Sequence, residues 1–412
     1  MALALDGYAD SVPLRVLHLS TYSDGGGAAR AANAVNRALE SIGVDSRLIS
    51  AQGPRFEAAR RADRMLWKFQ QSSVKTWRSP AQFGSLSARD INASSADIVN
   101  LHWVTDGFLS IEEIGKIQKP VVMSLYDMWA FCGTEHYGVD SPEARWRIGY
   151  TKENRPADER GWDIDRNTWE RKRKTWSEFQ IITASTWLTD AARDSSLFES
   201  WPVTRIPHPI DPARFEGIEE RVAKQSLGLD PARPVIGFVA SAGVSDQRKG
   251  FDLLAQALEH LPSPLANIQL LIVGPRPTMD ELPSGFDIRT IGSVKRSDTL
   301  VAAYSASDVL AVPSREDNMP LTAMEAQMCG TPVVAFNVGG LPDIIMDGET
   351  GFLAPPFDVQ RLARSLAQVL TDKHRGERFG AQARNRAEAI WGFDSVAKAY
   401  LAVYLETLDS YR

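Results

Sequence analysis

The sequence has few cysteines and no long apolar run. Its 412 residues include two cysteines, Cys132 and Cys329, which lie far apart in the chain. Two distant cysteines offer neither a disulfide framework nor a cluster of metal ligands, and they fit a reducing compartment. No apolar run reaches the roughly 18 residues that a membrane span needs, and the N-terminus lacks the pattern of a signal peptide. We therefore expect a cytoplasmic protein, with at most a peripheral contact at the inner face of the membrane.

Basic residues are not in excess either. The formal net charge is −6 at pH 7, and without a basic surplus we expect no nucleic-acid partner. Hydrophobic residues make up 43% of the chain and charged residues 24%, as in ordinary globular proteins. The length accommodates two domains, each large enough to bury a core.

Short runs of Val, Ile and Leu alternate with longer amphipathic segments, which predicts parallel strands buried on both faces. The pattern breaks at a proline-marked segment from Ile206 to Pro212 and then restarts. This predicts two doubly wound α/β domains, over residues 1–205 and 206–392, with a final helix over 393–412 that packs back on the first. The expected strands are residues 16–20, 46–50, 98–103, 121–127 and 181–185, then 235–241, 268–274, 288–292, 309–314, 332–336 and 351–354.

In such sheets ligands bind in the loops after the strands, beside helix N-termini. After the first strand, Asp24 is followed by three glycines and a helix. Glycines let a backbone approach a phosphate closely, and a helix N-terminus favours negative charge. We expect Gly26 and Gly27 to contact a phosphate, the alternative being a plain tight turn. The glycines do not form the full GxGxxG fingerprint that a nucleotide-sugar oxidoreductase or epimerase would need.

A second candidate follows the first strand of the second half. Arg248 and Lys249 stand next to each other in this loop. Two adjacent cations at the carboxyl end of a strand suit a diphosphate. The alternative is a solvated surface loop.

The segment 314–330 combines an acidic loop with a helix. Pro320 suits the first helical position and Gly330 the position beyond the last. The first amide groups of such a helix can hold a phosphate or a sugar oxygen. Glu325 is the only charged residue in 321–329, and burying it without partners would be costly. Ribose hydroxyls are natural partners; the alternative is a structural carboxylate that caps a loop or pairs with an arginine.

Aromatic, acidic and histidine side chains follow two strands of the first half. Placed at strand ends, they are candidates to contact ligands, although a lone histidine is more often a packing residue. The candidates are Tyr126, Asp127, Trp129 and His136 around one strand, and His102 and Trp103 after the strand before it.

Together these segments resemble glycosyltransferase family 4. The resemblance covers about residues 16–404 and is most specific where Glu325 is followed by Cys-Gly-Thr-Pro-Val-Val at 329–334. It implies the GT-B fold, two Rossmann-like domains facing each other across a cleft. It also implies a retaining, metal-independent transferase without a cofactor, which takes a nucleotide-diphosphate sugar to a saccharide or lipid-linked saccharide in polysaccharide or glycolipid synthesis.

The resemblance also implies roles for single residues. The acceptor would bind mostly on the first domain, with His102, Trp103, Trp129 and His136 as candidates. On the donor side, the resemblance implies Glu325 at the ribose, Arg248 and Lys249 at the diphosphate, Gly26 and Gly27 approaching it from the first domain, Gly274 and Gly292 near the base, and Asp317 with the backbone of Asn318, Met319, Pro320 and Leu321 at the sugar.

Two positions depart from the family pattern. The first carboxylate is usually a glutamate, but the spacing lands here on Asp317, with Glu316 one place earlier, and either can reach the sugar. The usual His-Asp pair reads Tyr126-Asp127, and that histidine commonly contacts the donor sugar. A neutral phenol there predicts an altered donor preference, such as a 6-deoxy sugar. The alternative is a non-catalytic partner subunit that binds nucleotide sugars.

The stretch from Arg60 to Arg78 is basic and aromatic, which predicts an amphipathic helix. It would either cover the sheet or rest on an anionic membrane or a lipid-diphosphate acceptor. An acidic pair, Asp163 and Asp165, lies outside the strand pattern, and we expect no metal site there. At helical spacing, Arg61, Arg64, Lys68, Lys75 and Arg78 share one side of the stretch, and Leu66, Phe69 and Trp77 another.

Overall fold

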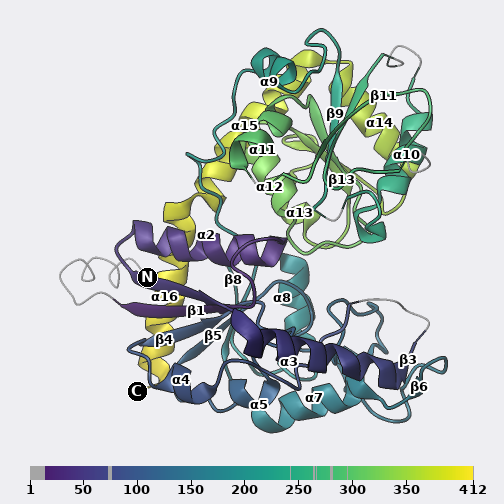
Figure 1. Cartoon of the computed structure of the whole chain (residues 1–412). Helices are drawn as coiled ribbons and strands as arrows, with labels where there is room; N and C mark the ends of the chain where they lie inside the picture. The colour runs from purple at the N-terminus through teal and green to yellow at the C-terminus, as the bar shows by residue number, and fades with distance from the viewer. Residues whose placement is uncertain are drawn as a thin grey trace. The chain divides into compact units, whose positions relative to one another are not determined.

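The computed structural model describes residues 14–72, 77–241, 243–262, 265, 267–278, 282–294 and 296–411. The chain divides into two compact units (Figure 1). The first unit contains residues 1–207 and 396–412, and the second contains residues 208–395. The predicted divisions after 205 and 392 therefore lie two and three residues before the observed ones.

The first unit is built on a six-stranded parallel sheet in the order β2-β1-β4-β5-β7-β8. A separate two-stranded antiparallel pair, β3 with β6, was not predicted, and neither was the edge strand β8. The strands are β1 Arg15–Ser20, β2 Asp45–Ser50, β3 Gln70–Gln71, β4 Ile98–Leu101, β5 Val121–Leu125, β6 Arg160–Gly161, β7 Gln180–Thr183 and β8 Val203–Arg205.

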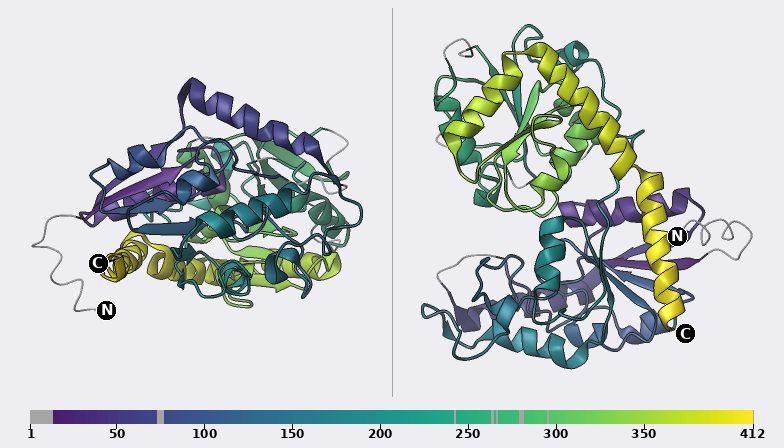
Figure 2. Two further views of the ribbon diagram at one scale, coloured as in Figure 1. Left: turned by 90° about the horizontal axis from the view of Figure 1, so that it is seen from below. Right: turned by 180° about the vertical axis from the view of Figure 1, so that it is seen from behind.

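Helices cover both faces of this sheet, because successive strand side chains point to opposite sides. Val16, Ile98 and Val122 face one layer, which contains α2 and α16. Their neighbours Leu17 and Val99 face the other layer, which contains α4, α5, α7 and α8 (Figures 1 and 2). The helices are α2 Gly27–Ser41, α3 Gly53–Met65, η2 Leu66–Phe69, α4 Ala88–Asn92, α5 Ile111–Ile114, α6 Arg145–Ile148, α7 Ile164–Thr175, α8 Thr186–Arg193 and α16 Phe393–Tyr411.

The second unit has a six-stranded parallel sheet in the order β11-β10-β9-β12-β13-β14. The direction of winding reverses between β9 and β12, and ligands of doubly wound sheets bind at such a switch point. The strands are β9 Val235–Val239, β10 Gln269–Val273, β11 Asp287–Gly292, β12 Val309–Val312, β13 Val333–Phe336 and β14 Gly351–Ala354. The helices are α9 Glu220–Ser226, η3 Gln247–Lys249, α10 Phe251–Glu259, α11 Ser297–Ser305, α12 Leu321–Met328, α13 Leu341–Ile344, α14 Val359–Leu370 and α15 Lys373–Trp391.

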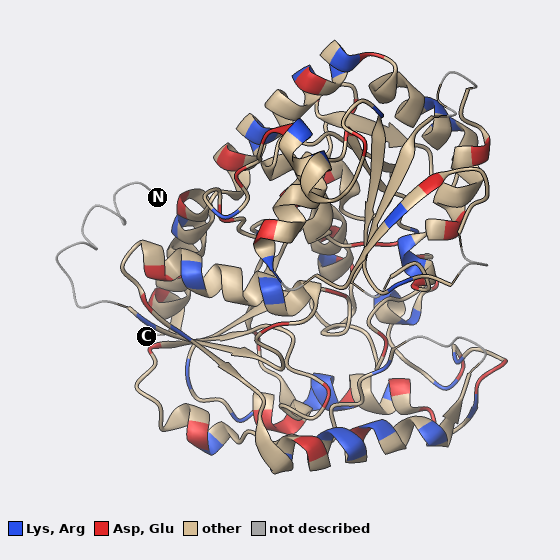
Figure 3. Ribbon diagram, turned by 45° about the horizontal axis from the view of Figure 1, so that its top comes forward, with Lys and Arg blue, Asp and Glu red and all other residues tan. Residues whose placement is uncertain are grey.

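Each predicted strand overlaps an observed strand. The longer predicted runs end one or two residues late, because the chain leaves the sheet before the predicted end. Tyr126 and Asp127 therefore lie just beyond β5, in the loop after it. Lys and Arg alternate with Asp and Glu over the helices of both units, in keeping with the small net charge (Figure 3). Within the described ranges, no helix is both long and apolar enough to cross a bilayer.

Candidate functional site

At the switch point of the second sheet, the loop after β9 docks on the loop after β12. The backbone amide of Arg315 donates to the carbonyl of Arg248 at 2.8 Å, and the guanidinium of Arg248 donates to the carbonyl of Glu316 at 3.2 Å. Gly250 has φ of +68°, and a Cβ there would lie 2.0 Å from the carbonyl oxygen of Pro313. Only glycine fits both the backbone conformation and this close approach.

The docking brings Arg248, Lys249 and Asp317 together. Lys249 Nζ lies 2.5 Å from Asp317 Oδ2, and the nearest nitrogen of Arg248 lies 3.8 Å from the same oxygen. Ser314 Oγ donates to that oxygen at 3.3 Å. The residue Asp317 is 6% exposed, whereas the side chains of Arg248 and Lys249 are 34% and 20% exposed. Both cations therefore keep surface that a ligand can reach.

His208 interacts electrostatically with Asp317 of this cluster and was not among the predicted site residues. It lies in the segment interpreted as a linker and is buried. Burial lowers the pKa of His208 to about 4, and the negative charge of Asp317 acts in the opposite direction. The imidazole is therefore neutral at pH 7. His208 and Asp317 both belong to the second unit but lie far apart in its sequence, so the residues around either one do not indicate that they interact.

The helix α12 begins at Leu321, with Pro320 as its N-cap rather than its first residue. Asn318, Met319 and Leu321 are buried, so their side chains are turned away from solvent. A ligand at this helix start would meet backbone rather than side chains, and the first amides of a helix have no intrahelical acceptor. The contact predicted for 318–321 stays a prediction.

Glu325 is 1% exposed on α12. Its Oε2 accepts a hydrogen bond from the hydroxyl of Tyr304, a buried residue of α11, at 2.8 Å. Tyr304 therefore gives the buried carboxylate a partner within the protein, so its burial by itself does not require a ribose. The ribose contact itself stays a prediction.

The two glycines expected near the base differ in their surroundings. A Cβ at Gly274, which has φ of +148°, would lie 2.2 Å from the carbonyl oxygen of Ala240. Packing within the second unit therefore accounts for this glycine without a ligand. At Gly292, φ is +81° and no described atom would lie within 4 Å of a Cβ.

In the first unit, the glycine run leads into α2 as expected. Asp24 Oδ1 accepts from the amide of Gly25 at 2.8 Å, and Gly26 is the N-cap of the helix. Gly26 has an extended backbone that any residue can adopt, and Gly27 is helical. A Cβ at either position would meet no described atom within 4 Å. The protein's own backbone therefore does not require glycine at these two positions, which leaves open space for an approaching group.

Asp127 organises the loop after β5. Its Oδ2 accepts from His136 Nδ1 at 2.7 Å and from Trp103 Nε1 at 3.0 Å, and its Oδ1 accepts from the amide of Trp129 at 2.9 Å. His136 Nε2 lies 2.8 Å from Ser79 Oγ. His136 and Trp129 are buried, while Trp103 and Asp127 are half-buried. The predicted residues do come together, but His136 and Trp129 mainly hold the loop.

Tyr126 contacts His102, another of the predicted candidates, although the sequence did not predict this contact. Its hydroxyl is 2.8 Å from His102 Nδ1, and His102 Nε2 is 2.8 Å from His18 Nδ1. Burial raises the pKa of Tyr126 well above its usual value and lowers that of His18 to about 3. A neutral phenol therefore stands at this edge of the sheet, backed by a buried pair of histidines.

The predicted single helix from Arg60 to Arg78 is wrong. The helix α3 ends at Met65, η2 follows, and the chain then enters the strand β3, because it turns to pair with β6. Arg64, whose side chain is 39% exposed, binds the buried Asp106 through two nitrogens, at 2.8 and 2.9 Å, so its charge is already paired within the first unit. Lys75 lies outside the described residues.

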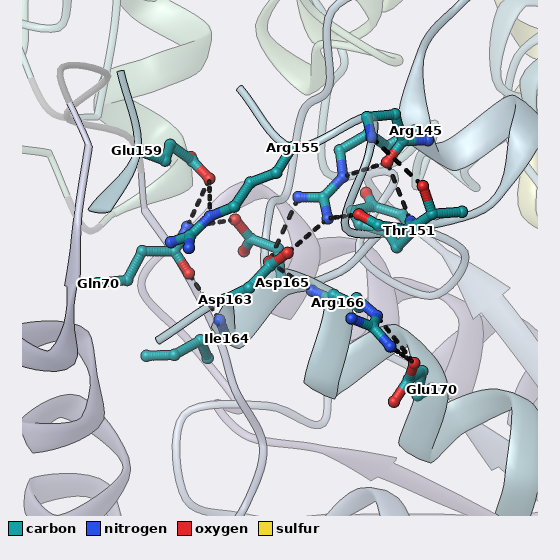
Figure 4. Close-up of polar contacts among 12 residues, drawn as sticks. Gln70, Arg145, Thr151, Arg155, Glu159, Asp163, Ile164, Asp165, Arg166 and Glu170 are labelled. Atoms are coloured by element: carbon teal, nitrogen blue, oxygen red, sulfur yellow. Dashed lines mark hydrogen bonds and ion pairs between the residues drawn. The ribbon is translucent and has the colours of Figure 1, made fainter. Parts of the chain in front are cut away.

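The acidic pair Asp163 and Asp165 joins Glu159 in a group whose carboxylate oxygens lie within 4.8 Å of one another. Figure 4 shows Arg145 reaching Asp163, at 2.8 Å. Arg78 pairs with Asp165 and, at 3.1 Å, with Glu159. These arginines compensate the charges of the partly buried carboxylates, so the cluster does not require a metal ion to be stable.

Comparison with known proteins points to one class. Residues 233–372 match the family described as Glycosyl transferases group 1. The chain is 37% identical over 207 residues to a D-inositol 3-phosphate glycosyltransferase from Xylanimonas cellulosilytica, a match that covers 48% of each chain. The chain thus spans about half the length, 48% and 46%, of the first curated relatives that it matches.

Solved structures match over nearly the whole chain. Sucrose-phosphate synthase from Thermosynechococcus elongatus aligns with a TM-score of 0.67 and 18% identity, covering 96% of this chain and 100% of that one. HepE from Anabaena, solved in complex with UDP-glucose, aligns with a TM-score of 0.62 and 17% identity over 96% and 100% of the two chains. The predicted GT-B fold and the resemblance to glycosyltransferases are confirmed.

Proposed function

We propose that this chain, a glycosyltransferase homologue of the GT-B fold, transfers a sugar with retention from a nucleotide-diphosphate sugar to a hydroxyl acceptor. The observation that carries the proposal is the pair of accessible cations, Arg248 and Lys249, beside the loop that opens α12 at the switch point of the second sheet. Cations and helix amides stabilise a departing diphosphate without a metal. A neighbour of the same fold, HepE, was solved with UDP-glucose, which supports this donor class.

Further donor contacts follow from the resemblance. We assign the ribose to Glu325, which would exchange or share its bond to Tyr304. We assign a phosphate to the backbone of Gly26 and Gly27, where the absence of neighbouring atoms leaves room for it.

The acceptor side is assigned to the carboxyl edge of the first sheet. The ring of Trp103 stacks on Tyr22 at 6.0 Å and on His136 at 5.3 Å between centroids, and its indole nitrogen binds Asp127. Half-buried aromatic rings beside a carboxylate suit a hydroxyl-rich ligand, since they offer both an apolar face and hydrogen bonds. A saccharide or lipid-linked saccharide is the proposed acceptor, and the name of the curated relatives adds D-inositol 3-phosphate as a candidate.

Ligand binding raises the apparent stability of the native state, so thermal shifts with UDP, GDP, ADP and dTDP identify the base. Transfer is then measured with the matching nucleotide sugars and with the acceptor candidates, with and without EDTA. We expect turnover that survives EDTA and falls at least tenfold in Lys249→Ala and Glu325→Ala, whose lost contacts are each worth about 1.5–3 kcal/mol. Nucleotide binding without turnover on any acceptor would favour a non-catalytic partner subunit, and no binding at all would refute the proposal.

Tyr126 makes a second part of the proposal, an altered donor preference. Its neutral phenol stands where the family commonly has a histidine that contacts the sugar. We propose a donor that lacks the 6-hydroxyl, such as a 6-deoxy sugar. A screen of nucleotide sugars tests this, and strong preference for a donor that carries the 6-hydroxyl would contradict it.

A peripheral contact with the inner face of an anionic membrane completes the proposal. Met65 and Phe69 are 58% and 59% exposed, and Trp162, whose amide donates to the carbonyl of Phe69 at 2.9 Å, is 44% exposed. The exposed cations Arg61 and Lys68 alternate with these apolar side chains along α3 and η2. Such a mixed surface suits anionic lipid headgroups.

Flotation with phosphatidylglycerol and phosphatidylcholine vesicles tests this contact. We expect binding to the anionic vesicles at low salt, lost in the variant Met65→Ser/Phe69→Ser. Val139→Ser is the control, because Val139 is another exposed apolar residue of the first unit. Equal vesicle binding by Met65→Ser/Phe69→Ser and Val139→Ser would refute the proposed membrane contact. Absence of binding by the unmodified chain at low salt would refute it as well.

A further inference from the structure

Asp317 is held from two sides in the second unit. Its side chain binds Lys249 and Ser314, as described above. Its backbone carbonyl accepts from the amide of Gly340 at 2.9 Å. A Cβ at Gly339 would lie 2.0 Å from the same carbonyl oxygen, so the chain after β13 packs directly against it. The carboxylate therefore has little freedom to follow a ligand.

The contacts of Asp317 are directed at a cation. One oxygen, Oδ2, receives Lys249 Nζ at 2.5 Å and Ser314 Oγ at 3.3 Å, with Arg248 at 3.8 Å. A carboxylate with 9% of its side chain exposed would be costly to bury without this compensation. The pair thus orders a long and otherwise rotatable lysine, whose fixation in water costs conformational entropy.

We infer that Asp317 is a positioning residue, which fixes Lys249 for the diphosphate of the donor and does not contact the transferred sugar. The inference rests on the proposed function and sharpens it, because the resemblance implies a sugar contact at this position. A lysine ammonium group that donates one hydrogen to Asp317 still has two hydrogens to donate to phosphate oxygens. The conformational entropy of the lysine side chain is therefore lost when the chain folds and not when the ligand binds.

Three roles for Asp317 predict different changes in ligand affinity when its charge is removed. If Asp317 only added negative charge near the diphosphate, its removal would tighten nucleotide binding. If it contacted the sugar, its removal would weaken the nucleotide sugar and spare the free nucleotide. A positioning residue weakens both ligands by the same factor, and only while Lys249 is present.

The test is a double-mutant cycle with Lys249→Met, Asp317→Asn and the double variant, read by calorimetric titration of UDP and UDP-glucose. We expect Asp317→Asn to weaken both ligands about fivefold, the cost of ordering one free lysine side chain. In the Lys249→Met background the same change should alter neither affinity by more than about twofold. Glu316→Gln removes the same charge one residue away and should show no such coupling to Lys249.

Selective loss of UDP-glucose, tighter UDP binding or additive effects in Asp317→Asn would each overturn the inference while leaving the proposed function standing. Absence of binding to UDP, GDP, ADP and dTDP by the unmodified chain would overturn both. Thermal unfolding without ligand checks that each variant folds. If Asp317→Asn does not fold, the double variant, which removes both charges, must bind both ligands as Lys249→Met does; any further loss would overturn the inference.

Discussion

Lys172 stabilises the loop after β5, which carries the acceptor-side candidates Trp129 and His136. It lies on α7 with none of its side chain exposed, and its ammonium donates to the carbonyls of Trp129, of Cys132 at 3.0 Å and of Gly133 at 2.9 Å. The same nitrogen lies 3.9 Å from the centre of the Trp129 ring. We predict that Lys172→Met destabilises the first unit, because three buried carbonyls lose their donor.

The expected loss is about 3 kcal/mol at pH 7. Each unpaired buried carbonyl costs about 1–3 kcal/mol, and release of the buried charge offsets part of the sum. Burial lowers the pKa of Lys172 from 10.5 to about 7. Between these values the unfolded chain holds a proton that the folded chain has released, so the unfolding free energy rises with pH. The difference between the unmodified chain and Lys172→Met should therefore grow from pH 7 to pH 9.

Urea unfolding followed by tryptophan fluorescence measures this difference. Ten of the eleven tryptophans lie in the first unit, and only Trp391 lies in the second, so the signal reports mainly on the unit that contains Lys172. Lys174→Met is the matched control, since Lys174 is exposed on the same helix. Surface changes of this kind stay within about 0.5 kcal/mol. Equal free energies of unfolding for Lys172→Met and Lys174→Met would refute the prediction.

Three further outcomes are expected. Tyr404→Phe removes the hydroxyl that accepts from the buried Asn100 at 2.6 Å, which should cost about 1–2 kcal/mol in the same urea assay. Since burial lowers the pKa of His18 to about 3, its ring should not titrate between pH 8 and 5 by NMR, and the first unit should lose stability as the pH falls below 6.5; a midpoint near 6 would contradict this. Gly250→Ala should unfold at a lower temperature than Gly285→Ala, because both have positive φ but only Gly250 is crowded by a carbonyl; equal melting would show that crowding is relieved at no cost.

Local sequence was enough to predict every strand of the two six-stranded sheets except β8. Runs of Val, Ile and Leu mark buried parallel strands because side chains on both faces must be apolar, and each predicted run overlaps an observed strand. The loops that carry Gly26, Lys249 and Asp317 were placed at strand ends for the same reason. The edge strand β8 was missed because its residues are only partly buried and show no apolar run.

The partners of the charged and polar groups were decided by the tertiary structure. Lys249 and Asp317 are 68 residues apart, Tyr304 and Glu325 are 21 apart, and His102 and Tyr126 are 24 apart. These separations reflect which strands are neighbours in a sheet and where each loop leaves it. The order of strands depends on packing over the whole unit, so a residue's own sequence neighbourhood predicts that it needs a partner but does not identify it.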